Sequence, residues 1–264
     1  MKHQNIHPAQ FFFATAPLPC PYLPGRMERR LVTELVGREA GDLHDVLSLS
    51  GFRRSHGIAY SPTCPTCDAC KAVRIDAAGF LPSRTQRRIW AVNADLTAAE
   101  RDPVATDEQY ELFARYQRSR HTGGDMEKMG PQDYQALVED TAVETMVVEF
   151  RDRDGNLVAA CLTDRVRGGL SAVYSFFDPA MARHSLGTFM ILWLVERARD
   201  LGLDHVYLGF WIADCGKMSY KSRFRPLEVF TGAGWVPFDA GPDGNGAGDG
   251  VGPGPAIASG SQRG

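Results

Sequence analysis

Three cysteines on one short loop form the densest group of chemically reactive side chains in the sequence. Cys64, Cys67 and Cys70 are joined by two C-x2-C steps beside prolines, a spacing that can direct three sulfurs at one soft metal. Cys20, which precedes Pro21, is the natural fourth ligand. Four protein ligands would close the site and favour a structural zinc or a redox-sensing iron–sulfur cluster over hydrolytic chemistry. Reduced thiols without metal are the alternative.

A second group of candidate side chains is basic and lies in the same half of the chain. Arg84, Arg87 and Arg88 share one side of a predicted helix at spacings of three and four residues. Arginine can bind phosphate through two parallel hydrogen bonds, so this face suits a nucleic-acid backbone. Arg53 and Arg54 belong to the same basic set. A solvated helix face is the alternative, but the local excess of positive charge favours RNA.

Aromatic side chains and a carboxylate end a predicted strand in the second half. Tyr174, Phe176 and Asp178 fall at its last positions, directly before Pro179. Proline cannot continue the hydrogen-bonded ladder, so the chain leaves the sheet here. Asp178 is therefore a candidate general base facing a cleft. The alternative is that Asp178 only starts a turn.

A segment rich in lysine and tyrosine follows the last strong strand. If residues 217–224 are helical, Lys217, Tyr220, Lys221 and Phe224 lie on one face. Such a face would suit an anionic or nucleotide ligand. An amphipathic helix that covers the core with its lysine stems is the alternative.

The elements that must position these residues follow an α+β pattern. In the second half, an antiparallel meander with a tight turn at Asp154-Gly155 leads into a β-α-β crossover. Ser83, Thr106 and Ser185 are predicted N-caps. The predicted strands are 30–36, 72–75, 145–150, 157–163, 170–177 and 205–208, with weaker candidates at 227–230 and 235–238, and the predicted helices are 42–49, 83–92, one after Thr106 and one from Ser185 to Gly202.

The composition is that of an ordinary globular protein. Of the 264 residues, 44% are hydrophobic and 23% are charged, and the net charge is -3, which excludes a polycationic nucleic-acid coat. No apolar run approaches the roughly 18 residues of a membrane span, and the apolar residues 11–13 are too few for a secretory signal. The expected compartment is the cytoplasm, where cysteines stay reduced.

The chain divides by character into three predicted parts. Residues 1–105 form an N-terminal lobe that contains the cysteines and the basic residues, and residues 106–240 form a second lobe with the meander. Residues 241–264 are rich in glycine and proline and are predicted to be disordered.

An acyl-CoA transferase is a rival for the α+β pattern. Such enzymes seat a pyrophosphate at the start of the helix after the fourth strand, on a turn with two small residues. Here Leu186 and Thr188 occupy those two positions, and Leu186 is expected to block close approach of the anion. The 3′ end of an aminoacyl-tRNA is an acyl donor without a pyrophosphate and fits better.

Short motifs in a fixed order over about residues 8–240 identify a family. They are Cys20-Pro21-Tyr22, 51–55 (GFRRS), the three-cysteine run with 71–74 (KAVR), 83–88 (SRTQRR), Tyr116-Gln117 with Arg120-His121, 174–179, Leu186-Gly187 and 215–221. Together they resemble the bacterial aspartate/glutamate leucyltransferases, relatives of the eukaryotic arginyl-tRNA–protein transferases.

The resemblance implies a GNAT-like acyltransferase C-terminal lobe with a smaller cysteine-containing N-terminal lobe. It implies transfer of leucine from Leu-tRNA to proteins beginning with Asp or Glu, which marks them for degradation. Arginine, the residue used by the eukaryotic relatives, is the alternative. Those relatives are linked to iron–sulfur binding through a C-x-x-C near the start, where this chain has Cys20 with Leu23.

The implied reaction needs no cofactor, because the donor ester is already activated. The enzyme must align the acceptor amine with the ester carbonyl, which contributes about 7–11 kcal/mol. Asp178 is the expected base, Tyr220 the hydrogen-bond donor to the departing oxygen, and backbone amides after Gly209 the oxyanion donors. Tyr174 is a further candidate catalytic residue.

The remaining candidates bind substrate. Lys217, Lys221 or Arg225 would pair with the acceptor carboxylate. The expected leucine pocket contains Trp211 and Phe176, the expected partner of the terminal adenosine is His121, and the expected tRNA contacts are Arg84, Arg87, Arg88, Arg53 and Arg54. Two rivals of other classes remain, namely an acyl-CoA-dependent acetyltransferase and a non-enzymatic cysteine-cluster protein that binds RNA or senses redox state.

Overall fold

A single large sheet forms the centre of the fold. The computed structural model describes residues 10–120 and 125–238. The sheet has eight strands in the order β14-β13-β7-β12-β11-β10-β9-β8. Its centre is an antiparallel meander of β9 (Thr145–Arg151), β10 (Leu157–Val166) and β11 (Gly169–Phe177), followed by α5 (Leu186–Asp200) and by β12 (His205–Trp211), which is parallel to β11. This is the meander and crossover expected of the acyltransferase-like lobe, and the predicted α+β class is confirmed.

The first half of the chain contributes strands to the same sheet. β7 (Lys71–Asp76) lies between β12 and β13 (Leu227–Phe230), and β8 (Thr97–Arg101) forms the edge beside β9. β14 (Trp235–Pro237) closes the other edge. The division of the chain at residue 105 stays a prediction, and the large sheet runs across that position.

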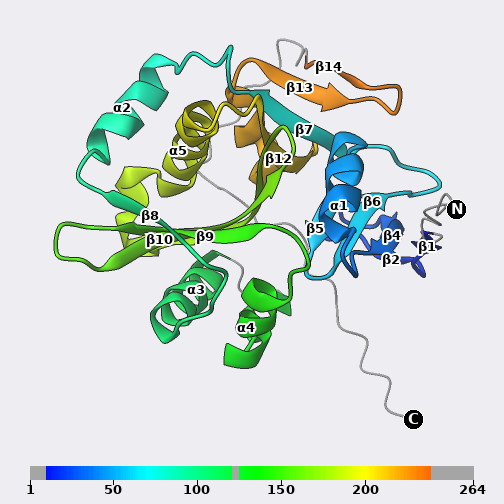
Figure 1. The fold of residues 1–264 in the computed structure, drawn as a ribbon, viewed down its shortest axis with the longest axis horizontal. Helices are drawn as coiled ribbons and strands as arrows, with labels where there is room; N and C mark the ends of the chain where they lie inside the picture. Colours follow the sequence, from blue (N-terminus) through cyan, green and yellow to red (C-terminus); the bar gives the residue numbers. More distant parts are fainter. Residues whose placement is uncertain (1–9, 121–124, 239–264) are drawn as a thin grey trace, which may run out of the picture.

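Helices cover both faces of the sheet (Figure 1). α5 packs on one face against β11 and β12, with α2 (Arg84–Val92) outside it. α3 (Asp107–Arg120) packs against β10 and β11, and α4 (Pro131–Glu139) packs against α3; both lie on the opposite side of β9 and β10 in Figure 1. The main core fills the space between these layers.

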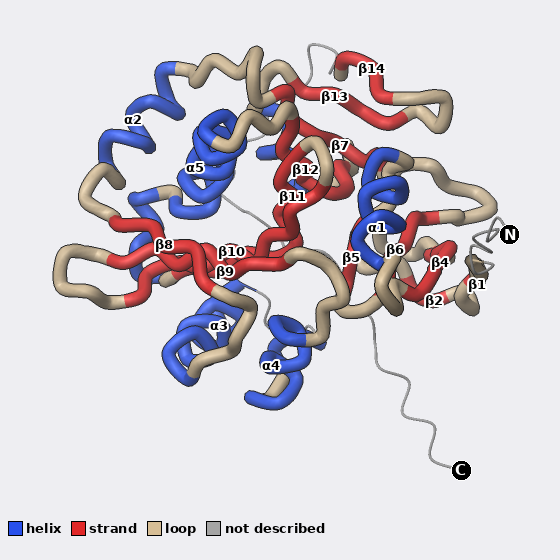
Figure 2. Tube along the Cα trace, viewed as in Figure 1, coloured by secondary structure: helices blue, strands red, loops and turns tan. Residues whose placement is uncertain are grey.

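A smaller sheet lies beside the large one, as the strands in Figure 2 show. Its strand order is β1-β4-β6-β5, and α1 packs beside it. The remaining elements are β1 (Phe13–Ala14), β2 (Leu18–Pro19), β3 (Met27–Glu28), β4 (Arg30–Glu34), α1 (Ala40–Leu49), β5 (Arg53–Ser55), β6 (Ile58–Pro62) and the 3-10 helices η1 (Asp125–Lys128), η2 (Pro179–His184) and η3 (Gly216–Arg223).

A buried ion pair joins the two sheets. Arg54 on β5 donates from Nε and Nη2 to the two carboxylate oxygens of Asp164 on β10, at 2.6 and 2.7 Å. Thr145 donates to the same carboxylate at 2.8 Å, and His44 on α1 lies 3.7 Å from it. Both charged side chains are fully buried, so this pair fixes the small sheet against the meander.

The predicted helix starts have mixed outcomes. Ser83 accepts from the Gln86 amide in a full capping box, and Thr106 accepts from the Gln109 amide at 3.2 Å, so both caps are confirmed. Ser185 occupies the N-cap position of α5, but its backbone is left-handed (φ 49°) and its side chain makes no capping bond. The predicted side-chain cap at Ser185 is therefore wrong.

The segment predicted as one helix face at 217–224 also differs. Residues 216–223 form the 3-10 helix η3, and Phe224 follows it; Tyr220, Lys221 and Phe224 are buried while Lys217 is exposed. The four side chains therefore do not form one ligand-facing surface. The tail predicted to be disordered, 241–264, lies outside the described residues. Over the described ranges, no helix combines the length and apolar character of a membrane span.

Candidate active site

The parallel strands β11 and β12 separate in the middle of the sheet. Their pairing covers only Gly169–Ser171 against His205–Tyr207. Beyond this point Arg53, carried by β5 of the small sheet, donates from Nη2 to the carbonyls of Ala172 and Val173 at 3.2 and 2.6 Å. An arginine side chain from the first half therefore occupies the opening between two strands of the second half.

Gly209 on β12 makes room for this arginine. It has a left-handed backbone (φ +70°) beside a bulge in the β7–β12 ladder, and a Cβ placed on it would lie 2.3 Å from Nη1 of Arg53. Glycine is thus required here both by the backbone conformation and by the close approach of the guanidinium. The oxyanion role expected for the amides after Gly209 remains a prediction.

Lys221 contacts the same stretch of β12. Its Nζ donates to the carbonyl of Phe210 at 2.5 Å, and the side chain is 2% exposed. Burial, followed by the neighbouring charge of Arg53, lowers the pKa of the Lys221 amine well below its ordinary value. Lys221 is therefore not the surface lysine that an amphipathic helix would present.

A cavity of about 290 Å³ opens at the start of α5. We call it the helix-start cavity; its lining includes Arg88, Arg183, Ser185, Tyr220 and Arg223. The first amides of a helix lack partners within the helix and favour negative charge. Three arginines and a helix N-terminus together make this cavity suitable for a phosphate-bearing ligand.

Leu186 does not block this cavity. Its side chain is fully buried in the main core, while Ser185 and Thr188 face the opening. The expected obstruction by Leu186 is wrong, because the first turn of α5 points that side chain inward.

Buried tyrosine side chains lie where α3 packs on β11. The Tyr174 hydroxyl accepts a short hydrogen bond from the side-chain amide of Gln117, and Tyr116 stacks edge-on against Phe177 at 4.9 Å between ring centroids. Burial raises the pKa of both Tyr174 and Tyr220. These phenols therefore stay protonated near neutral pH and do not act as bases.

Asp178 follows β11 and performs a structural role as well as any catalytic one. Its Oδ1 accepts from the Ala180 amide at 2.8 Å and caps η2, and its Oδ2 lies 3.9 Å from Arg115. The carboxylate thus starts a turn, the alternative raised by the Asp-Pro sequence, and remains partly exposed. Its role as a base is still a prediction.

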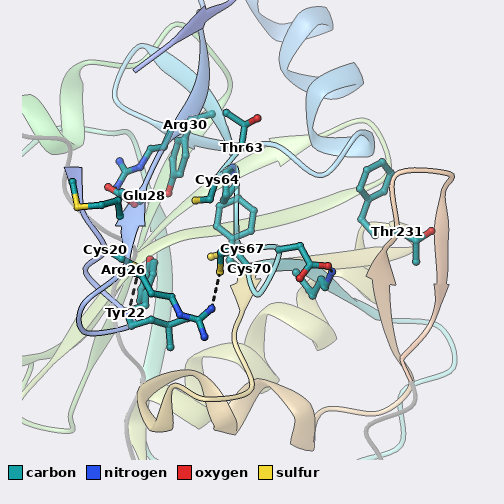
Figure 3. Close-up of a pocket in the computed structure, with 18 residues that line it drawn as sticks. Cys20, Tyr22, Arg26, Glu28, Arg30, Thr63, Cys64, Cys67, Cys70 and Thr231 are labelled. Atoms are coloured by element: carbon teal, nitrogen blue, oxygen red, sulfur yellow. Dashed lines mark hydrogen bonds and ion pairs between the residues drawn. The ribbon is translucent and has the colours of Figure 1, made fainter. Parts of the chain in front are cut away.

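The four predicted metal ligands line a second cavity, of about 280 Å³. Figure 3 shows Cys20, Cys64, Cys67 and Cys70 around it, together with Tyr22. We call this the cysteine cavity. The sequence therefore correctly placed Cys20 near the distant loop, since the four side chains share one opening.

The thiols in this cavity differ in acidity. The Ala69 amide and then the Arg26 guanidinium, at 3.1 Å from the sulfur, lower the pKa of Cys67. Burial and the other cysteines raise the pKa of Cys70 to about 12. Cys20 and Cys64 accept from the amides of Leu23 and Arg29, both at 3.4 Å.

The arrangement does not fit a bound metal as it stands. Within residues 10–120 and 125–238, no three His, Cys, Asp or Glu side chains have the geometry of a metal site. The mechanism below uses no metal.

The other predicted residues fall into separate groups. Arg84, Arg87 and Arg88 are exposed along α2, whereas β5, which carries Arg53 and Arg54, lies away from α2 in Figure 1. Arg54 is held in the buried ion pair with Asp164 and cannot reach tRNA without breaking it. The predicted tRNA set is therefore split.

The candidate substrate-binding residues are also dispersed. Phe176 is buried and Trp211 is half-buried, stacked edge-on against Phe238 at 4.7 Å. Arg225 is exposed and lies over the Phe238 ring, with Nη1 bonded to the Phe238 carbonyl. His121 lies outside the described residues.

Sequence reasoning missed three side chains of the two cavities. Arg183 and Arg223 line the helix-start cavity, and the Tyr22 hydroxyl is buried at the cysteine cavity without a hydrogen-bond partner in the described part of the chain. Arg183, two residues before the predicted helix start at Ser185, was a usable signal. Nothing in the sequence marks Tyr22 beyond its place after Cys20-Pro21.

Comparison with known proteins agrees with the motifs. The family model "Arginine-tRNA-protein transferase, N terminus" matches residues 18–88, and its C-terminal counterpart matches residues 108–231. An aspartate/glutamate leucyltransferase of Paramagnetospirillum magneticum is 58% identical over 241 residues, covering 91% of this chain and 99% of the relative. One from Rhodospirillum rubrum is 53% identical over 240 residues, covering 90% and 98%.

Solved structures give only a distant likeness. L-PGS from Bacillus licheniformis superposes on 69% of this chain and 52% of its own, with a TM-score of 0.44 and 11% identity, which is too remote to argue from. The family models and the curated relatives cover most of the sequence. The chain therefore belongs to the arginine-tRNA-protein transferase family and, within it, to the aspartate/glutamate leucyltransferases.

Proposed function

We propose that the protein transfers leucine from Leu-tRNA to the α-amine of proteins that begin with Asp or Glu, which directs them to degradation. The helix-start cavity carries this proposal, because it combines Arg88, Arg183 and Arg223 with Tyr220 at a helix N-terminus. The exposed arginines of α2 extend the basic surface from that cavity. The names of the relatives support leucine as the transferred residue.

The reaction is a displacement at the ester carbonyl. The acceptor nitrogen attacks the carbonyl carbon, the new C–N bond forms, and the bond to the 3′ oxygen of the terminal adenosine breaks. An α-amine has a pKa of about 7.7–8 and is partly neutral at pH 7, so alignment of the two substrates supplies most of the acceleration.

Two side chains donate and accept protons in the proposed reaction. Tyr220, a protonated phenol at the helix-start cavity, donates to the departing 3′ oxygen. Asp178 receives the proton from the amine, directly or through water, because it is the partly exposed carboxylate at the end of β11. Tyr174 keeps Gln117 in place beneath them.

Of the residues with proposed binding roles, Arg88 lines the helix-start cavity and the others lie outside the two cavities. Arg84, Arg87 and Arg88 contact the tRNA backbone, and Trp211 with Phe176 supplies apolar surface for the leucine side chain. Lys217 and Arg225 are exposed cations that remain available for an acidic acceptor.

The direct test is a transfer assay with labelled Leu-tRNA or Arg-tRNA and peptides that begin with Asp, Glu or Ala. Label should move from Leu-tRNA to the Asp and Glu peptides only. Transfer from Arg-tRNA instead would overturn the donor, and transfer from neither tRNA would overturn the proposal. Asp178→Ala should slow transfer while tRNA binding stays unchanged.

An acyl-CoA donor is the second candidate, since the buried Leu186 leaves the start of α5 open to a pyrophosphate. It is tested in parallel by calorimetric titration with CoA. Measurable CoA binding together with failed transfer from both tRNAs would favour it.

We keep zinc or an iron–sulfur cluster at the four cysteines as a separate hypothesis. The shared cavity and the amide-to-sulfur hydrogen bonds support it, whereas the present side-chain geometry does not. Metal analysis and absorption spectra of protein purified without oxygen test it. A protein free of zinc, iron and visible absorption would overturn it.

A further inference from the structure

Two basic side chains flank β12 where it separates from β11, and both are bonded to neutral groups. Arg53 donates to the carbonyls of Ala172 and Val173, and Lys221 donates to the carbonyl of Phe210. Across the described residues, no carboxylate forms an ion pair with either side chain.

A polar cluster of this kind is unfavourable without an anion. Burying basic groups away from water is unfavourable unless they are paired, and Lys221 is 2% exposed. The buried hydroxyl of Tyr22 adds a donor that has no partner in the described part of the chain. A guanidinium and an amine that meet only carbonyl groups, together with one hydroxyl that lacks a partner, favour an anionic ligand.

The cysteine cavity lies next to Arg53, because its lining includes Tyr60, the residue opposite Arg53 in the β5–β6 ladder. Tyr22 and Tyr60 line that cavity (Figure 3 labels Tyr22). The charge of Arg53 partly offsets the rise in pKa that burial causes at both hydroxyls, and it acts in the same way on Tyr220 at the helix-start cavity. The Arg53 guanidinium also packs against Gly209, whose neighbour Phe210 lines the cysteine cavity.

We propose that Arg53, with Lys221 and the Tyr22 hydroxyl beside it, binds the side-chain carboxylate of the acceptor's N-terminal Asp or Glu. The acceptor enters through the cysteine cavity and meets the donor ester where β11 and β12 separate. This inference rests on the proposed function and assigns its acidic specificity to Arg53 in place of the exposed Lys217 and Arg225.

The geometry favours a carboxylate over a tRNA phosphate. Only Nη2 of Arg53 is used by the two carbonyls, so Nε and Nη1 remain to donate, and the guanidinium fork matches a carboxylate. Arg53 is partly buried and Lys221 is 2% exposed, which suits one side chain at the end of a peptide. The exposed arginines of α2 suit a polynucleotide instead.

The test compares binding of two short peptides that differ only in their first residue, Asp or Asn. Asn has the shape of Asp without its charge. Calorimetry on the full chain measures the ratio of the two affinities for wild type, Arg53→Gln and the control Arg153→Gln, whose exposed side chain lies outside both cavities. Wild type and Arg153→Gln should prefer the Asp peptide by about 10- to 100-fold.

Arg53→Gln should reduce that preference to near one, and Arg53→Lys should restore part of it. Circular dichroism checks that each variant folds. If Arg53→Gln does not fold, the ratio of the Asp and Asn peptide affinities is measured for Lys221→Met in its place. The inference would be overturned if Arg53→Gln kept the preference for the Asp peptide, or if it lost affinity equally for both peptides. It would also be overturned if only Lys217→Gln lost the preference. A selective effect on tRNA affinity would assign Arg53 to the tRNA instead.

Leucine transfer by the same proteins separates this inference from the proposed function. Charge-selective peptide binding without transfer in wild type would remove the proposed function and leave the carboxylate site standing. Transfer to acidic peptides, together with an unaltered preference for the Asp peptide in Arg53→Gln, would leave the proposed function standing and remove the carboxylate site.

Discussion

The thiol of Cys67 differs from that of Cys70 in the direction in which its surroundings shift its pKa. The Ala69 amide and the Arg26 guanidinium favour the thiolate and lower its pKa, whereas burial raises the pKa of Cys70 to about 12 and that of Cys161 to about 11. The thiolate is the reactive form of cysteine. Reactivity in this protein is therefore set by individual contacts rather than by the shared loop.

Alkylation should follow this order. Brief treatment with iodoacetamide at neutral pH should modify Cys67 before Cys70 and Cys161, as measured by mass spectrometry of peptides. Arg26→Gln should slow the modification of Cys67, because it removes one of the two donors to the sulfur. Earlier modification of Cys70 would contradict the assignment.

Lys221 predicts a pH-dependent stability. Its pKa in the folded protein lies well below its ordinary value of about 10.4, so the unfolded chain binds the proton more tightly in the interval between the two. Unfolding free energy contributed by Lys221 therefore rises as pH rises through that interval. In Lys221→Met this rise is lost.

The measurement is urea unfolding of wild type and Lys221→Met at several pH values from 7 to 10. The unfolding free energy of wild type should increase relative to that of Lys221→Met as the pH rises, by at most about 1.4 kcal/mol per pH unit. Lys217→Met, which alters an exposed lysine, should show a constant difference. A constant difference for Lys221→Met would refute the assignment.

At the scale of elements, helix α2 combines a capped N-terminus with a basic exposed surface. Ser83 and Gln86 cap it reciprocally, and the Gln86 side chain also donates to the carbonyl of Arg223 at 3.2 Å, which ties α2 to the helix-start cavity. Its exposed arginines are thereby held beside the start of α5. The helix is positioned by its cap and presents its charge outward.

Salt dependence of tRNA binding tests that role. Removal of a phosphate contact lowers the slope of log affinity against log salt by about 0.7–0.9. The double variant Arg84→Gln/Arg88→Gln should therefore weaken tRNA binding at low salt and flatten the slope by about 1.4–1.8, whereas Arg153→Gln should leave both unchanged. An unaltered slope in the double variant would exclude a phosphate role for α2.

The elements that sequence predicts best are those with a strong local signal. The meander strands and α5 have regular apolar patterns and turn residues such as Asp154-Gly155, and they appear close to the expected bounds. β8 was missed because its sequence, TAAER, has few residues that favour strands and lies at a sheet edge. The site was only partly predictable, since Arg53 meets Val173 and Gly209 through tertiary packing alone.

At the scale of the whole molecule, the two sheets depend on each other. Asp164 on β10 receives Arg54 from β5, and Arg167 after β10 reaches Asp42 on α1. The first pair is fully buried and the second is exposed. Loss of one partner from a buried pair leaves an uncompensated charge.

Asp164→Asn should therefore lower the unfolding free energy by about 3–5 kcal/mol, in one cooperative transition. Circular dichroism and tyrosine fluorescence during urea unfolding should coincide. Asp42→Asn, which opens only the exposed pair, should have little effect. Two separate transitions in Asp164→Asn would mean that the small sheet unfolds independently.

The central position of β7 also governs how the chain folds during synthesis. Both of its neighbours, β12 and β13, belong to the last part of the chain. At about 5–20 residues per second, the ribosome delivers them on the order of ten seconds after β7. A strand with the buried residues Val73 and Ile75 must wait unpaired for that time, so β7 exposes apolar surface that a chaperone can protect in the nascent protein.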